Sequence, residues 1–245
     1  MTEAQRRDDA PAEPGDRKSQ PDSQDREGVL DLLGLLAYAE LVAFFRLSED
    51  AALAPSLPDK AALAGLAVAE FGHFRLLCQR ISALGAKPEQ AMLPFAPALD
   101  AFHARTAPSD WLEGLVKAYV GDGIAADFYR TVAQLVDAQT RELVLQVLAD
   151  TGHAEFVIAR VRAAIAADPQ VEGRLALWAR RLVGEALAQA YRVVAGRPPL
   201  ANLLAGRAAS EASAGPAGEL GDIGRMLAQF TDAHAQRMAS LGLTS

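Results

Sequence analysis

Residues 29–50, VLDLLGLLAYAELVAFFRLSED, would carry apolar side chains on nearly every face of a helix. A helix that is apolar all round is a buried one, so this segment needs other helices packed around it. No stretch of the chain shows the sustained alternation of apolar and polar residues that is typical of a half-buried strand. The sequence therefore predicts an all-α protein built around a buried helix.

The other expected helices are bounded by turn and capping residues. Gly85 followed by Pro88 is a helix stop, and Ser109 or Asp110 and then Asp137 are suitable N-caps for the next two helices. The expected helices span about residues 59–84, 111–136, 137–167, 171–195 and 219–241, with one short helix inside 89–108. This pattern predicts a four-helix bundle with additional C-terminal helices.

The first 27 residues differ from the rest of the chain. They are polar, contain prolines and show no periodicity, so they bury too little apolar area to offset the entropy of ordering. We expect residues 1–27 to be a disordered tail and residues 28–245 to form one helical domain.

Several features favour a cytoplasmic protein. Charges and prolines stand where a secretory signal would have an apolar stretch, and no run of 18 or more apolar residues suggests a membrane span. Cys78 is the single cysteine, which excludes an intrachain disulfide and a metal site built from several thiolates. The net charge of −7 is a mild argument against a nucleic-acid partner.

Two carboxylate–histidine pairs have the spacing of a metal site. Glu70 and His73 are three residues apart in the second helix, and Asp150 and His153 have the same spacing in the fourth. Residues i and i+3 project from the same face of a helix, so each pair is able to share one metal ion. The alternative for each pair is an ordinary contact on a helix surface.

A bundle metal site of this type also needs a lone carboxylate from each of the other two helices. Glu40 is the isolated acid of the first helix, and burying it without a partner would cost several kcal/mol. In the third helix the candidates are Asp122, flanked by two glycines, and Asp127. Asp122 lies 28 residues before Asp150, close to the spacing of 30 between Glu40 and Glu70, so Asp122 is the preferred ligand and Asp127 the alternative.

The phrases AYAELVAFFRL, AVAEFGHF, YVGDGIAADFYR and VLADTGHAEF resemble the ferritin-like di-iron carboxylate proteins. More narrowly, they resemble the group that contains the tRNA hydroxylase acting on 2-methylthio-isopentenyl-adenosine. The resemblance covers about residues 28–240. It implies two iron ions at the matching positions Glu40, Glu70, His73, Asp122, Asp150 and His153.

The resemblance further implies a non-haem di-iron hydroxylase or monooxygenase. Its partners would be dioxygen, an electron donor, a modified adenosine of tRNA as a weakly supported substrate, and a second copy in a homodimer. Aspartate stands at 122 and 150 where the superfamily usually has glutamate, and nitrogen and oxygen ligands also suit manganese or zinc. The alternatives are therefore a non-catalytic metal-binding or storage protein and a metal-free helical interaction module.

Overall fold

The computed structural model describes residues 23–149, 152–203 and 232–243, and within these ranges it contains helices and no strand. The elements are α1 (Ser23–Leu53), α2 (Leu57–Ala83), α3 (Pro88–Met92), α4 (Ala96–Arg105), α5 (Trp111–Ala133), α6 (Ala138–Val147), α7 (His153–Ala167) and α8 (Gln170–Gly196). Residues 232–241 are also helical.

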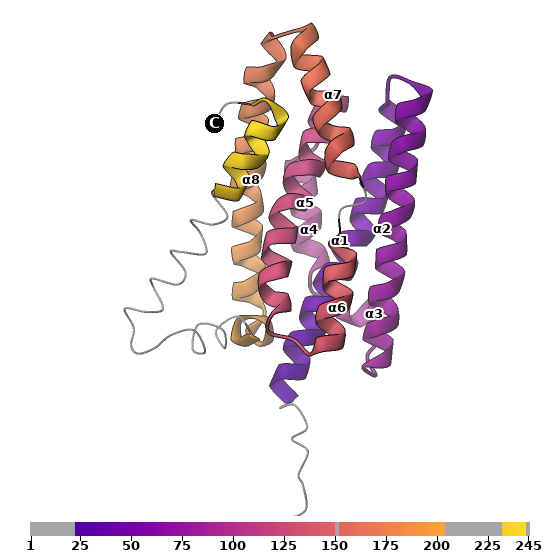
Figure 1. Cartoon of the computed structure of the whole chain (residues 1–245). Helices are drawn as coiled ribbons and strands as arrows, with labels where there is room; N and C mark the ends of the chain where they lie inside the picture. Colours follow the sequence, from indigo (N-terminus) through magenta and orange to yellow (C-terminus); the bar gives the residue numbers. More distant parts are fainter. Residues whose placement is uncertain (1–22, 150–151, 204–231, 244–245) are drawn as a thin grey trace, which may run out of the picture.

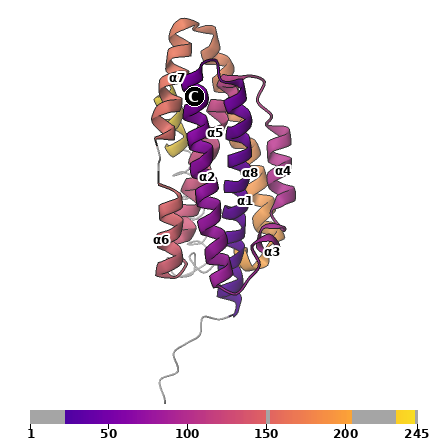
Figure 2. The same ribbon diagram turned by 90° about the vertical axis from the view of Figure 1, so that its right-hand side faces the viewer.

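The helices form an elongated bundle, and α1 and α2 pair along their whole length (Figure 1). Helix α5 contacts α1, α6, α7 and α8, so it lies at the centre of the remaining elements. Figure 2 shows the short α3 and α4 on the side of the bundle where the connection from α2 to α5 runs. The arrangement confirms the prediction of an all-α bundle with additional C-terminal helices.

Capping residues set the ends of the long helices as the sequence predicts. The side chain of Asp110 accepts a hydrogen bond from the Glu113 backbone N–H at the start of α5, and Asp137 accepts one from Thr140 at the start of α6. Such caps satisfy backbone donors that the first helical turn leaves unpaired. At the other end of α2, Gly85 has φ +77°, a left-handed conformation that suits glycine.

Helix α1 begins at Ser23, earlier than the expected domain boundary at residue 28. A contact explains part of this extension, because the guanidinium of Arg26 donates a hydrogen bond to the Leu84 carbonyl at the end of α2. Extending an existing helix is also easier than starting one. The remainder of the predicted tail, residues 1–22, lies outside the described residues.

The expected helix over residues 137–167 is interrupted, which corrects the sequence prediction. Helix α6 ends at Val147 and α7 starts at His153, with Gly152 at φ +89° as the residue before α7. A left-handed residue cannot continue an α-helix, and glycine adopts this conformation without steric cost. The two segments are stacked end to end beside α5 and together take the place of one long helix (Figure 1).

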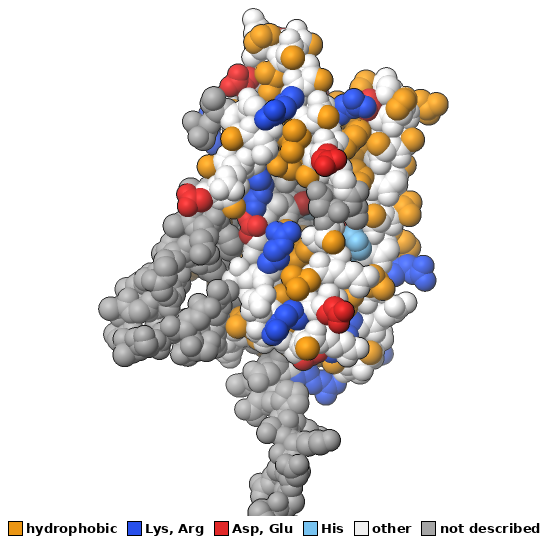
Figure 3. All heavy atoms as spheres, in the orientation of Figure 1, with side chains coloured by type: hydrophobic (Ala, Val, Ile, Leu, Met, Phe, Trp, Pro, Cys, Tyr) orange, Lys and Arg blue, Asp and Glu red, His pale blue; other side chains and the backbone are white. Residues whose placement is uncertain are grey.

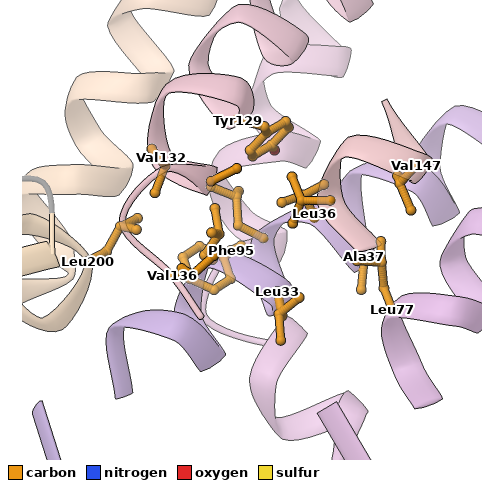
Figure 4. Packing of buried hydrophobic residues seen from close by; sticks show 14 of the residues in the cluster. Leu33, Leu36, Ala37, Leu77, Phe95, Tyr129, Val132, Val136, Val147 and Leu200 are labelled. Carbon is orange, nitrogen blue, oxygen red and sulfur yellow. The ribbon is translucent and has the colours of Figure 1, made fainter. Parts of the chain in front are cut away.

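The buried apolar residues form two clusters. One joins the first half of α1 to the second halves of α2 and α5, and includes Leu36, Phe95 and Tyr129 (Figure 4). The other joins Leu47 of α1 to the first halves of α2, α5 and α8 and to α7. The polar residues in the middle of α1, α2 and α5 therefore lie between two apolar layers.

Close backbone packing anchors α1 to α3. A Cβ placed on Gly34 would lie 2.2 Å from the carbonyl oxygen of Ala91, so only glycine fits there. This contact holds the first half of α1 against the start of the connection that leads to α4.

Helices α1 and α2 are long and apolar enough to cross a membrane by length and composition alone, although neither contains an uninterrupted run of 18 apolar residues. This is weak evidence, because the core helix of a soluble protein passes the same test. Helix α2 does expose apolar side chains, including Val68 and Phe71. Figure 3 shows apolar side chains along the right-hand edge of the molecule, where α2 lies in Figure 1.

Candidate metal centre

Three predicted ligands meet between α1 and α2. The Nδ1 atom of His73 lies 3.5 Å from a carboxylate oxygen of Glu40 and 3.5 Å from one of Glu70. One potential ligand atom from each residue lies within 4.8 Å of the others. The three side chains are largely buried, so the fold brings two carboxylates and an imidazole together away from bulk water.

The ionisable groups of this cluster shift one another's pKa values. Among the described residues, His73 is the one ion-pair partner of Glu40 and of Glu70. Burial raises the pKa of Glu40 well above its usual value; His73 opposes this shift and Glu70 adds to it. Burial also raises the pKa of Glu70, but His73 and Glu40 lower it more, so its net shift is downward. Burial thus favours the protonated form of Glu40, whereas its neighbours favour the ionised form of Glu70, and a bound metal ion would allow both groups to be carboxylates.

His73 responds to the same carboxylates. Its contacts with Glu40 and then Glu70 raise its pKa to about 9, although burial opposes the shift. The Nδ1 atom of His73 and one carboxylate oxygen of Glu40 are buried without a hydrogen-bond partner among the described residues. Buried polar atoms are rarely left unpaired, so these two atoms fit a ligand that the polypeptide does not supply.

A second pair of predicted ligands meets between α5 and α7. The Nδ1 atom of His153 lies 3.2 Å from a carboxylate oxygen of Asp122. His153 is the first residue of α7, directly after the left-handed Gly152, so the break between α6 and α7 places it at mid-height in the bundle. The side chain of His153 is largely buried, whereas that of Asp122 is half exposed.

The two pairs belong to one electrostatic site. Desolvation raises the pKa of Asp122 and His153 lowers it, while the Glu70 carboxylate raises it further. His153 in turn contributes to lowering the pKa of Glu70. Glu40, Glu70, His73, Asp122 and His153 also line the same cavity, which has a volume of about 290 Å³.

The alternative helix-three candidate, Asp127, lies in a different setting. Its carboxylate pairs with the guanidinium of Arg237 and lies 3.5 Å from Arg130. A carboxylate held by two arginines has its charge already compensated, and Asp127 does not line the cavity. The geometry thus favours Asp122 over Asp127 as the helix-three ligand. The remaining predicted ligand, Asp150, lies outside the described residues.

Sequence reasoning missed two residues that line this cavity. Tyr129 is almost fully buried and lines the cavity. Burial is the main cause that raises its pKa, and the charge of Glu40 adds to the shift, so its hydroxyl stays protonated at neutral pH. Arg237 reaches the cavity from the C-terminal helix, where no local motif marks it. An aromatic residue in an apolar helix is expected to belong to the hydrophobic core, so the sequence alone does not indicate a functional role for Tyr129.

The donor set suits an oxygen-seeking or borderline metal. Carboxylates and imidazoles bind iron, manganese and zinc, and a pair of carboxylate–histidine motifs with extra carboxylates is the arrangement found in di-metal helix bundles. Among the described residues, Glu70 and His73 form one such motif, and Glu40, Asp122 and His153 line the same cavity. The residues present therefore fit a metal centre.

A larger pocket adjoins the cavity. Its volume is about 450 Å³, and α1, α4, α5 and α8 line it mainly with apolar residues. Ala39, Ala43, Asp122, Ala125 and Tyr129 line both spaces. Phe128 lines this pocket and Tyr119 lines the smaller cavity, whereas Phe44 and Phe74 each pack against Phe71.

Comparisons with known proteins agree with this architecture. A solved structure described as "Protein 19 with aldehyde deformylating oxidase activity from Synechococcus" matches with a TM-score of 0.66 and 19% sequence identity, over 90% of this chain and 92% of that chain. At this identity the likeness shows the fold. No curated protein sequence matches significantly. Residues 23–207 match the family described as "Ferritin-like domain, actinomycetes", and the chain therefore belongs to this ferritin-like family.

Proposed function

We propose that this protein is a non-haem di-iron oxygenase that uses dioxygen and an external electron donor to oxidise a small apolar substrate. The observation that carries the proposal is the meeting of Glu40, Glu70 and His73 within 4.8 Å, inside a ferritin-like bundle and in one cavity with Asp122 and His153. The adjoining apolar pocket supplies room for a substrate.

The proposed ligands are divided between the two sides of the cavity. Glu40, Glu70 and His73 would hold metal from α1 and α2, while Asp122 and His153 would hold it from α5 and α7, together with Asp150 as a sequence-based member. When bound, iron supplies the redox chemistry with dioxygen that side chains cannot provide. Manganese and zinc remain the alternative metals on ligand chemistry alone.

The protein's own residues prepare the environment for this chemistry. The two apolar clusters on either side of these polar residues help to shield the Glu40 and Glu70 carboxylates from water. Tyr129, whose hydroxyl keeps its proton, borders both the cavity and the pocket and is placed to donate a hydrogen bond at their junction. Ala39, Ala43 and Ala125 leave space between the two, because their side chains are small.

The apolar lining of the large pocket favours a small apolar substrate over a tRNA substrate. The resemblance to the tRNA hydroxylase suggests a modified adenosine, but two of the arginines of α8 are engaged in contacts within the protein. Arg174 pairs with Asp110 and Glu113, and Arg181 donates to the Arg105 carbonyl. We therefore place a small apolar molecule first. An aldehyde is the first compound class to test, because it is named for the Synechococcus protein.

The cellular setting remains part of the proposal. We propose a cytoplasmic protein that acts without a membrane partner. A homodimer is the expected assembly, and the exposed apolar side of α2 with Val68 and Phe71 is the face that a second copy would cover.

Metal content and oxygen consumption test the proposal together. Protein purified without chelator should contain about two iron ions per chain by elemental mass spectrometry, as in di-iron bundles of this type. It should also consume dioxygen when given a chemical reductant. Glu70→Ala and His153→Ala should lose both properties, whereas Glu89→Ala, an exposed acid on α3, should keep them.

The same experiment separates the rival functions. Iron binding without substrate oxidation would indicate a storage or metal-binding protein. Absence of metal after anaerobic addition of ferrous ion would contradict the proposal and leave a helical interaction module.

A further inference from the structure

A group of polar residues lies at the end of the 450 Å³ pocket that is remote from Glu70 and His73. Arg46, Glu49 and Asp50 on α1, His103 on α4 and Lys117 on α5 all line this pocket. Gly114 on α5 allows α1 and α5 to pack closely here, since a Cβ on it would lie 3.1 Å from the Asp50 carboxylate. The pocket thus runs from Ala39 and Asp122 beside the metal centre to a polar end.

Lys117 is the buried cation of this polar end, with 8% of its surface exposed. Its ammonium donates one hydrogen bond, 2.7 Å long, to the Thr106 carbonyl and lies 5.6 Å from the centre of the Phe102 ring. An ammonium has three donors, so two remain for other acceptors. Keeping a charged group with spare donors inside a mainly apolar pocket is costly unless something accepts from it.

His103 adds an unused polar atom. Its Nδ1 is buried and has no hydrogen-bond partner among the described residues, although the ring packs edge-on against Phe102. Burial and the nearby cations Lys117 and Arg46 lower its pKa to about 3, so its imidazole is neutral. A neutral imidazole offers one donor and one acceptor.

The charges at this end balance without a ligand. Arg46 pairs with Glu49 at 2.7 Å, and the charges of Lys117 and Asp50 interact with each other. An anionic or cationic ligand would leave one buried charge uncompensated. A hydroxyl adds no charge, and it accepts from a lysine while donating to a carboxylate or an imidazole.

We propose that the pocket binds an elongated molecule with an apolar body and an uncharged hydroxyl group, and that Lys117, His103 and Asp50 bind this hydroxyl. The apolar body would extend toward Asp122, which lies about 8 Å from Lys117 along the axis of α5. The assignment of the apolar end, near Asp122, as the end that reacts rests on the proposed function. The binding of the hydroxyl by Lys117, His103 and Asp50 does not rest on it.

Calorimetric titration of the full-length protein with 1-octanol tests the proposal. We expect saturable binding of 1-octanol and binding about tenfold weaker for 1-chlorooctane, which lacks the donor. Lys117→Met should weaken 1-octanol binding about tenfold, whereas the matched variant Lys60→Met, an exposed lysine on α2, should bind like the wild type. Equal binding of 1-octanol and 1-chlorooctane, or unchanged binding by Lys117→Met, would overturn the proposal.

A second variant covers the case in which Lys117→Met does not fold. His103→Phe keeps the ring that packs on Phe102 and removes no hydrogen bond made by Nδ1, so it should fold and still bind 1-octanol several-fold more weakly. Unchanged binding by this variant would count against the proposal. Tighter binding of octanoate than of 1-octanol would also overturn it, because the site would then recognise an anion.

The position of the ligand is checked at Gly121. A Cβ there meets no atom within 4 Å, so Gly121→Leu should fill the pocket without disturbing the helix and should abolish 1-octanol binding. Wild-type binding by Gly121→Leu would place the ligand elsewhere and overturn the proposal. Metal content, measured on the same samples, reports on the oxygenase proposal independently, so the two failures are distinguishable.

Discussion

The Nδ1 atom of His153 lies 3.2 Å from the carboxylate of Asp122, so the first residue of α7 meets the middle of α5. Asp127, about one and a half turns further along α5, instead pairs with Arg237 of the C-terminal helix. Asp122 therefore lines the cavity of the candidate metal centre, whereas Asp127 holds the C-terminal helix through Arg237.

This difference predicts opposite outcomes for two similar substitutions. Asp122→Ala should lower the amount of metal bound per chain, because it removes a ligand, whereas Asp127→Ala should leave it near the wild-type value. Elemental mass spectrometry on both variants is the measurement. Loss of metal in Asp127→Ala alone would show that the helix-three assignment is wrong.

Metal affinity should depend on pH through His73. Its pKa is raised to about 9, so the metal-free imidazole carries a proton at neutral pH, and a metal ion must displace it. Affinity for ferrous or cobaltous ion should therefore fall as the pH is lowered from 8.5 to 6.5, by up to about tenfold per pH unit for each proton displaced. Anaerobic titrations at several pH values measure this, and a flat profile would contradict it.

Lys117 should make the stability rise with pH between about 8 and 10. Burial lowers its pKa from 10.5 to about 8, so in this range the folded protein has released a proton that the unfolded chain still holds. The contribution of Lys117 to the free energy of unfolding should increase by something on the order of 2 kcal/mol across the range. Urea unfolding of the wild type and of Lys117→Met at both pH values isolates the effect, which the variant should lack.

Two glycine-to-alanine substitutions should change stability in opposite directions. Gly34→Ala places a methyl group 2.2 Å from the Ala91 carbonyl oxygen and should destabilise the protein by about 1–3 kcal/mol or more. Gly65→Ala in α2 meets no atom within 4 Å and should stabilise it by about 0.5–1 kcal/mol through helix propensity. Thermal and chemical unfolding report both; equal effects would mean that α1 and α3 do not pack so closely.

Much of the fold follows from local patterns. The limits of α2, α5 and α8 depend on caps, glycines and prolines within a few residues of each helix end, and these signals are visible in the sequence. The proximity of Glu70 and His73 follows likewise from helical periodicity alone.

The break between α6 and α7 was not predicted, because the glycine of the segment DTGH is compatible with a continuous helix as well as with a left-handed turn. Tertiary packing decides between them. The polar end of the large pocket could not be predicted from the sequence either, because His103 and Lys117 lie on different helices and neither belongs to a recognisable motif.

The wall shared by the two cavities limits which substitutions can reshape the large pocket without affecting the candidate metal centre. Ala39 and Ala43 border both the metal centre and the large pocket, so a bulkier residue at either position would crowd the ligands as it reshaped the binding space. Ala186 and Ala190 on α8 border only the large pocket. Substitutions at these two positions of α8 would therefore reshape the large pocket without crowding the ligands of the candidate metal centre.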